Sequence, residues 1–187
     1  MKDVQNSIDQ RGIAIQRVGI KDAYLPFLIK TKAEGYQQVT AKVCFTVALP
    51  MEYKGTHMSR FFYFLNPWST KPLAEPEMAE ILSEALDKLQ AEEAAIRIDF
   101  KYFVERQAPV SGRCSVLDVD CFFAGKMSRG KALEFTLGVK VPYTSLCPCS
   151  KEISRYGAHN QRGILAAELR FRPGYECILI EDLVELL

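Results

Sequence analysis

The sequence predicts an α+β protein in which helices pack on one face of an antiparallel sheet. Residues 38–49, 95–105 and 132–141 each alternate apolar with polar side chains, which is the period of a half-buried strand. Residues 77–92 instead repeat their apolar side chains at helical spacing, with acidic residues on the opposite face. Because each strand has one apolar face, we expect helices to cover that face of the sheet.

The first half of the chain contains weaker strand signals around the clearest one. Residues 12–30 predict a pair of short strands, and Pro50 ends the strand at 38–49 because proline lacks an amide donor. A glycine-containing turn around His57 follows, and the apolar run 61–65 is interpreted as the returning strand. These segments predict antiparallel neighbours joined by turns.

The second half continues the same pattern. Residues 114–123 and 163–171 predict two further strands, and residues 127–130 predict a turn. Residues 180–187 predict the start of a helix. The sequence contains no internal repeat, and we expect a single domain over residues 1–187.

Composition argues against several functional classes. The net charge is +1, so the chain has no basic surplus of the kind that binds nucleic acid, and any phosphate binding must be local. No apolar run approaches the ~20 residues of a membrane span. The opening residues are polar, unlike a signal peptide, and the six cysteines are scattered. We therefore expect a cytoplasmic protein with reduced thiols that binds neither nucleic acid nor membrane.

The segment 146–162 holds the densest chemistry in the chain: two thiols, several cations and one of only two histidines. Ser150 is a good helix N-cap and Gly157 a good helix end, so we expect a short helix over residues 150–156. The Cys-Pro-Cys sequence just before it faces the positive end of that helix, where a thiolate is favoured over a thiol.

Cys147 and His159 flank the expected helix and can converge on one point. A soft thiolate and an imidazole in one place indicate a transition-metal pair. Two packed structural cysteines explain the sequence equally well, because Cys-Pro-Cys is not the Cys-x-x-Cys spacing of zinc ribbons or redox sites. A disulfide between Cys147 and Cys149 would be strained at this spacing, and we discount it.

The second histidine, His57, lies in a turn over residues 52–60 that also carries two cations and two hydroxyls. One interpretation is an anion cradle, in which Arg60 gives forked hydrogen bonds and Lys54 a point charge. The alternative is a solvated connection between strands, because Lys and Arg in turns are usually only hydrated.

Three stretches carry a resemblance to a known family: Lys-Gly-Thr-His-Met-Ser-Arg at 54–60, Leu-Cys-Pro-Cys-Ser-Lys at 146–151 and Tyr-Gly-Ala-His-Asn-Gln-Arg at 156–162. Together with stretches 3–5 and 17–21 they closely resemble the type IB GTP cyclohydrolase I family, in order and over nearly the whole chain. The resemblance implies the tunnelling fold, in which the sheets of several subunits close into a barrel with active sites between subunits. It therefore implies a homo-oligomer, and we expect a homotetramer.

The resemblance also implies an enzyme. Members of the family are metal-dependent hydrolases that attack GTP at C8 of guanine, release formate and form 7,8-dihydroneopterin triphosphate, in the first step of folate and pterin biosynthesis. The expected cofactor is a divalent metal, with zinc favoured and manganese or iron as alternatives. Three other functions stay open: an archaeal-type relative that forms a dihydroneopterin cyclic phosphate, a nonenzymatic metal- or nucleotide-binding module, and a thiol redox protein.

By the match of motifs, Cys147 and His159 are expected to bind the metal, Cys149 to assist beside it and His57 to transfer protons. GTP carries several negative charges, so cations must converge on it. The expected substrate-binding residues are Lys54, Ser59, Arg60, Lys151, Gln161 and Arg162. The simpler alternatives are that Cys149 is a packed thiol and that His57 only fixes its own turn.

Members of this family continue beyond a helix like that predicted at 180–187. The resemblance places a carboxylate ligand of the metal, an acidic residue that grips the guanine and a further catalytic histidine beyond Leu187. We therefore expect that the sequence is truncated at its C-terminus and is not a complete catalyst on its own.

Overall fold

The computed structural model describes residues 14–49, 51, 56–108, 110–171 and 178–187. These residues form one sheet of seven strands in the order β3-β1-β2-β4-β5-β6-β7. Neighbouring strands are antiparallel except β1 and β3, which are parallel. The strands are β1 (Ile15–Lys30), β2 (Tyr36–Leu49), β3 (Pro72–Leu73), β4 (Glu93–Gln107), β5 (Cys114–Ser128), β6 (Glu134–Leu146) and β7 (Asn160–Phe171).

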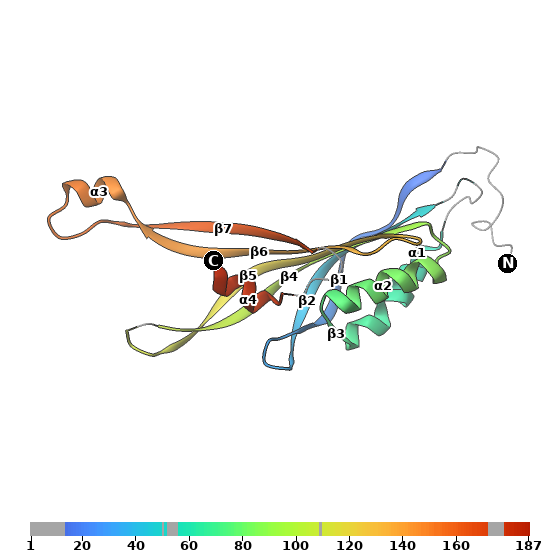
Figure 1. Cartoon of the computed structure of the whole chain (residues 1–187), viewed down its shortest axis with the longest axis horizontal. Coiled ribbons are helices and arrows are strands. Elements are labelled where there is room, and N and C mark those ends of the chain that lie inside the picture. Colours follow the sequence, from blue (N-terminus) through green and yellow to red (C-terminus); the bar gives the residue numbers. More distant parts are fainter. Residues whose placement is uncertain (1–13, 50, 52–55, 109, 172–177) are drawn as a thin grey trace.

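Helices cover one face of this sheet, as the sequence predicts. Figure 1 shows α1 (Met58–Leu65), α2 (Glu75–Lys88) and α4 (Ile180–Leu186) on the same side of the strands, with the short helix α3 (Pro148–Ile153) at the far end of β6 and β7. A 3₁₀ helix, η1 (Asn66–Thr70), links α1 to β3. The α+β class is therefore confirmed. No helix in the described ranges is long and apolar enough to cross a membrane.

The core lies between the helices and the alternating apolar positions of the strands. In β2, every second residue from Val39 to Val47 is buried, and its neighbours are exposed or half-buried. The ring of Phe45 meets Phe61 of α1 edge-on at 5.3 Å and stacks on Phe64 at 5.5 Å. The period of two in the sequence therefore identified the face that needs covering.

Two predictions for the first half of the chain are wrong. Residues 15–30 form one long strand rather than a pair, because register shifts between Ile15 and Val18 and between Ile20 and Ala23 absorb the irregular alternation. Residues 61–65 belong to a helix rather than to a returning strand. Phe61, Phe64 and Leu65 lie at i, i+3 and i+4, so a helix buries all three against the sheet.

Several element ends also differ from the predictions. α2 begins at Glu75 because Glu77 accepts a hydrogen bond from the Ala74 amide at 2.9 Å, and it ends at Lys88 rather than at residue 92. β5 continues through Ser128, into the predicted turn, because its ladder with β4 reaches Glu93. β6 likewise extends to Leu146, which carries the next segment outward from the core.

The sheet forks at one end. β5 and β6 pair from Asp120↔Lys140 to Lys126↔Glu134. Beyond that ladder, in the described chain, residues 114–119 pair with β4 alone and residues 141–146 with β7 alone. Figure 1 shows the two hairpins leaving the body as separate arms, with α3 at the tip of the β6–β7 arm.

Two glycines of the sheet lie under aromatic rings, one on each face. Phe122 lies over Gly138, where an added Cβ would come within 2.0 Å of the ring, and the Arg97 guanidinium stacks on Phe122 at 3.6 Å. In the β6–β7 arm, Tyr143 lies over Gly163, where an added Cβ would come within 2.5 Å. Each glycine therefore gives an aromatic ring room to lie flat on the sheet.

Alanine should cost more stability at Gly138 than at Gly163. Phe122 is 9% exposed and held by Arg97, whereas Tyr143 is 51% exposed and can swing into solvent. We expect Gly138→Ala to lower the free energy of unfolding by about 1–3 kcal/mol, the range for an overpacked core. Gly163→Ala should change it by less than half as much. Urea denaturation of both variants measures the difference, and equal losses would contradict this account.

Candidate functional site

The β6–β7 ladder brings the expected metal ligands together. Its last pair is Leu146↔Asn160, so Cys147 and His159 follow directly opposite each other. The Cys147 amide donates to the His159 carbonyl at 3.1 Å. Two residues twelve positions apart in sequence are thus fixed side by side by backbone pairing alone.

The short helix between them is displaced from its predicted position. α3 spans Pro148–Ile153 rather than 150–156, and its N-cap is Cys147 rather than Ser150. Proline suits the first helical position because its φ is preset and the amide it lacks would have no helical partner. Ser154 is already extended, so Gly157 lies outside the helix.

Ser150 contacts both expected ligands. Its Oγ lies 2.6 Å from His159 Nδ1. The pKa of the Cys147 thiol is lowered, first by the amide and hydroxyl of Ser150 and then by the amide and thiol of Cys149. No side-chain cap hydrogen bond forms at Cys147. The sequence predicted thiolate stabilisation here but missed the contact of the Ser150 hydroxyl with His159.

Other predicted residues gather at the same tip. Cys149 and Lys151 are exposed on α3, and Gln161 and Arg162 are exposed at the start of β7. An open hollow of about 720 Å³ lies beside them, lined by Ser150, Ile153, Ser154, Arg155, Gly157, Ala158 and His159. The tip therefore offers a thiol pair, an imidazole and cations around open space.

The first predicted block lies elsewhere, at the start of α1. His57 is the half-buried N-cap of that helix, and its carbonyl accepts from the Arg60 amide at 3.0 Å. Ser59 and Arg60 are exposed in the first turn. Lys54 lies outside the described residues. The expected strand connection is therefore a helix start, which still presents a hydroxyl and a guanidinium to solvent.

The two blocks are far apart in one chain. Phe45 of β2 packs under α1. The strand pairing through β4 and β5 places Phe45 level with Phe135 of β6. From Phe135 to Leu146 the strand advances about 11 residues at ~3.3 Å each, or roughly 36 Å. Figure 1 accordingly places α1 and α3 toward opposite ends of the long axis. A single copy does not bring His57 to Cys147.

The described residues contain no cluster of three or more His, Cys, Asp or Glu side chains that could hold a metal ion. Cys147 and His159 are thus a pair, and the carboxylate expected beyond Leu187 stays a prediction.

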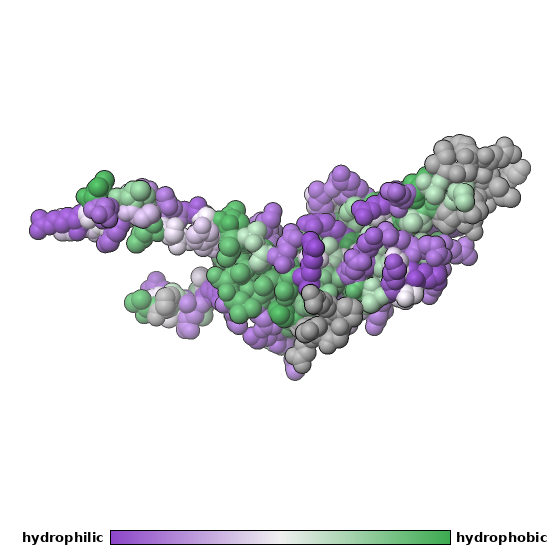
Figure 2. Space-filling model, turned by 45° about the horizontal axis from the view of Figure 1, so that its top comes forward, coloured by the Kyte–Doolittle hydropathy of each residue, from purple (hydrophilic) through white to green (hydrophobic). Residues whose placement is uncertain are grey.

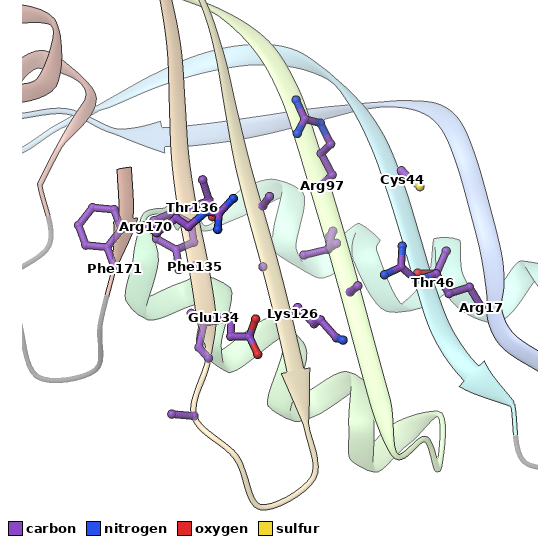
Figure 3. A pocket seen from close by; sticks show the side chains of 16 residues that line it. Arg17, Cys44, Thr46, Arg97, Lys126, Glu134, Phe135, Thr136, Arg170 and Phe171 are labelled. Carbon is purple, nitrogen blue, oxygen red and sulfur yellow. The ribbon is translucent and has the colours of Figure 1, made fainter. Parts of the chain in front are cut away.

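A second hollow, of about 670 Å³, lies on the helix-free face of the sheet (Figure 3). Its polar lining is Arg17, Cys44, Thr46, Arg97, Lys126, Glu134, Thr136 and Arg170. Two of these cations are ion-paired, Arg97 with Asp99 at 2.8 Å and Lys126 with Glu93 at 3.0 Å. No sequence motif marks this hollow, although its polar lining residues occupy the polar positions of the alternating strands. None of the predicted site residues lies in it.

Comparison with known proteins identifies the family of the chain. The family model described as type I GTP cyclohydrolase folE2 matches residues 1–187. The GTP cyclohydrolase FolE2 of Geotalea uraniireducens is 45% identical over 186 residues, covering 100% of this chain and 66% of that protein. That of Geobacter sulfurreducens is 46% identical over 187 residues, covering 100% and 70%. The chain thus spans about two thirds of the length of these relatives, and it belongs to the type I GTP cyclohydrolase family.

Proposed function

We propose that this protein is a metal-dependent GTP cyclohydrolase that hydrolyses GTP at C8 of guanine, releases formate and forms 7,8-dihydroneopterin triphosphate. Family membership supports the reaction. The observation that carries the site is the pairing of Cys147 with His159 across the mouth of one hairpin, with Ser150 Oγ 2.6 Å from His159 Nδ1.

The donor set suits a divalent metal. Cys147 and His159 offer a thiolate and an imidazole, the ligands that zinc favours, with manganese or iron as alternatives. The lowered pKa of Cys147 increases the fraction of thiolate, which is the form that binds metals. A metal held here would supply hydroxide at neutral pH, because it lowers the pKa of bound water towards ~7. Two ligands from the hairpin leave further positions for water and other donors.

The remaining roles are assigned by chemistry and position. His57 transfers a proton, because a neutral imidazole has one ring nitrogen that donates and one that accepts. Ser59, Arg60 and Lys54 of the first block bind the triphosphate together with the cations of the tip, Lys151 and Arg162, while Gln161 hydrogen-bonds the substrate. Cys149 assists beside the metal.

These roles require two copies of the chain. Roughly 36 Å of strand separates the level of α1 from the hairpin tip, so a site that uses both His57 and Cys147 takes one from each subunit. We propose a homotetramer with active sites between subunits.

The forked end offers surface for this assembly. Residues 114–119 and 141–146 each leave one strand edge unpaired within the described chain. The β6–β7 arm also carries exposed large apolar side chains: Tyr143, Leu146, Ile153, Tyr156, Ile164 and Leu165. Figure 2 shows hydrophobic surface gathered where the two arms leave the body. We place the assembled protein in the cytoplasm, where the free thiols at Cys44, Cys114, Cys121, Cys147 and Cys149 stay reduced.

Metal binding should depend on the hairpin pair. We expect the anaerobically purified protein to bind zinc, and Cys147→Ala or His159→Ala to bind it at least about 100-fold more weakly, because losing even an outer partner of a ligand costs 10–100-fold. Competition with a chromophoric chelator measures the affinity. Cys114→Ala, which removes an exposed thiol from another part of the sheet, is the matched control. Unchanged affinity in both ligand variants would refute this site.

The Cys147 thiol should react at lower pH than its exposure suggests. Its lowered pKa means that the thiolate persists as pH falls below the ordinary thiol range and disappears only at more acidic pH. Cys147 is half-buried and Cys149 exposed, so accessibility alone favours Cys149. We expect iodoacetamide to label Cys147 first near pH 7 in metal-free protein, as measured by peptide mass spectrometry. Preferential labelling of Cys149 at every pH would contradict the prediction.

Subunit mixing tests the shared site. In protein that includes the residues predicted to follow Leu187, His57→Ala and Cys147→Ala should each lack GTP turnover. When they are co-assembled, about one quarter of wild-type formate release should return, because random mixing gives one site in four both intact groups. A mixture of Cys147→Ala with His159→Ala is the control, since both groups belong to one hairpin, and it should stay inactive. Recovery in neither mixture would mean that His57 and Cys147 do not share a site.

A further inference from the structure

We propose that Ser150 is a positioning residue that holds the His159 ring and the Cys147 sulfur in the arrangement that binds the metal. This inference rests on the proposed function for the identity of the two ligands. It concerns a residue whose hydroxyl has no other assigned role, because the N-cap of α3 is Cys147 and not Ser150.

The position of Ser150 follows from the local backbone. It lies three residues after Cys147, so one helical turn places it above the residue that begins α3. The hairpin ladder places His159 on the other side, opposite Cys147. The Ser150 hydroxyl thus lies between two groups that the backbone has already brought together.

A hydroxyl can donate one hydrogen bond and accept two, which suits this position. We assign His159 Nδ1–H as the donor to Ser150 Oγ over 2.6 Å, which leaves the hydroxyl proton of Ser150 for the Cys147 sulfur, the thiol whose pKa this hydroxyl helps to lower. This direction satisfies all three groups when the sulfur is a thiolate. It also places the ring proton on Nδ1 and leaves the lone pair of Nε2 free.

A free Nε2 lone pair is what a metal ligand needs. Histidines that bind metals commonly donate their other ring N–H to a fixed acceptor, which sets the tautomer and the ring orientation. Within the described part of the chain, Ser150 is the only side chain hydrogen-bonded to this ring. Without it, the proton can occupy Nε2 and the exposed ring can rotate away from Cys147.

The first experiment reads the tautomer in metal-free protein. Long-range ¹H–¹⁵N correlation spectra of neutral His159 should show a protonated Nδ1 and an unprotonated Nε2 in the wild type. Ser150→Ala should shift the ring toward the Nε2–H form, and Ser150→Thr, which keeps the hydroxyl, should restore the wild-type pattern. An unchanged tautomer in Ser150→Ala would overturn the proposal.

The second experiment measures zinc affinity in the same proteins. We expect Ser150→Ala to bind zinc 10–100-fold more weakly, the usual cost of losing a partner of a metal-binding histidine, and Ser150→Thr to recover most of the loss. Ser154→Ala is the matched control. Its hydroxyl accepts from the Gly157 amide at 3.1 Å in the same turn and does not contact His159. An equal loss in Ser154→Ala would show a general effect of the turn and would overturn the assignment.

The two readouts separate this inference from the proposed function. If Cys147→Ala and His159→Ala bind zinc like the wild type, the metal site is wrong, whatever the tautomer experiment gives. If those variants lose zinc while Ser150→Ala keeps both the tautomer and the affinity, the metal site stands and the role of Ser150 is refuted. Circular dichroism of each variant confirms that the sheet is intact before either result is interpreted.

Discussion

The burial of one apolar sheet face under α1, α2 and α4 is the constraint on which the rest of the structure depends. Strand side chains alternate, so a slip of one residue in β6 would turn Phe135, Leu137 and Val139 out of the core. The core therefore fixes the register of β6 against its neighbours. The β6–β7 ladder keeps the same register beyond the core up to its last pair. Cys147 and His159 therefore lie opposite each other at its end.

The chemistry lies where this core no longer reaches. Beyond Lys140 the β6–β7 arm is paired only with itself in the described chain, and its side chains are largely exposed. A thiol there depends on local amides rather than on burial to change its acidity, which is the effect that the start of α3 has on Cys147. The opposite case is Cys121, where burial in the sheet raises the pKa of the thiol to about 12 and leaves it inert.

The sequence correctly predicted the strands and the helix that repeat their apolar positions several times. The strands at 38–49 and 95–105 and the helix near 77–92 were found because each shows several repeats of its period. The run 61–65 is too short to separate a strand from a helix, and only its contact with Phe45 decides. The fork between β5 and β6 was not predictable, because the length of a ladder depends on two strands and neither sequence alone specifies it.

The candidate site shows the same division. The motifs pointed to Cys147 and His159, and the backbone does place them together. The helix boundary was misplaced because Ser150 is a strong N-cap residue, yet Pro148 allows the helix to begin earlier. Because the helix begins earlier, the Ser150 hydroxyl does not cap it and instead contacts the imidazole of His159. This contact depends on the conformation of the whole turn, so no single residue predicts it.

The fork also has a thermodynamic consequence. An arm that projects from the body without a core of its own gains order mainly from whatever it touches. If neighbouring copies grip it, as the exposed apolar residues favour, then ion uptake and subunit association become linked equilibria. Metal binding and subunit association would each strengthen the other by the same free energy. Dilution of the protein would therefore lower its affinity for the metal, and a chelator would lower the affinity between subunits.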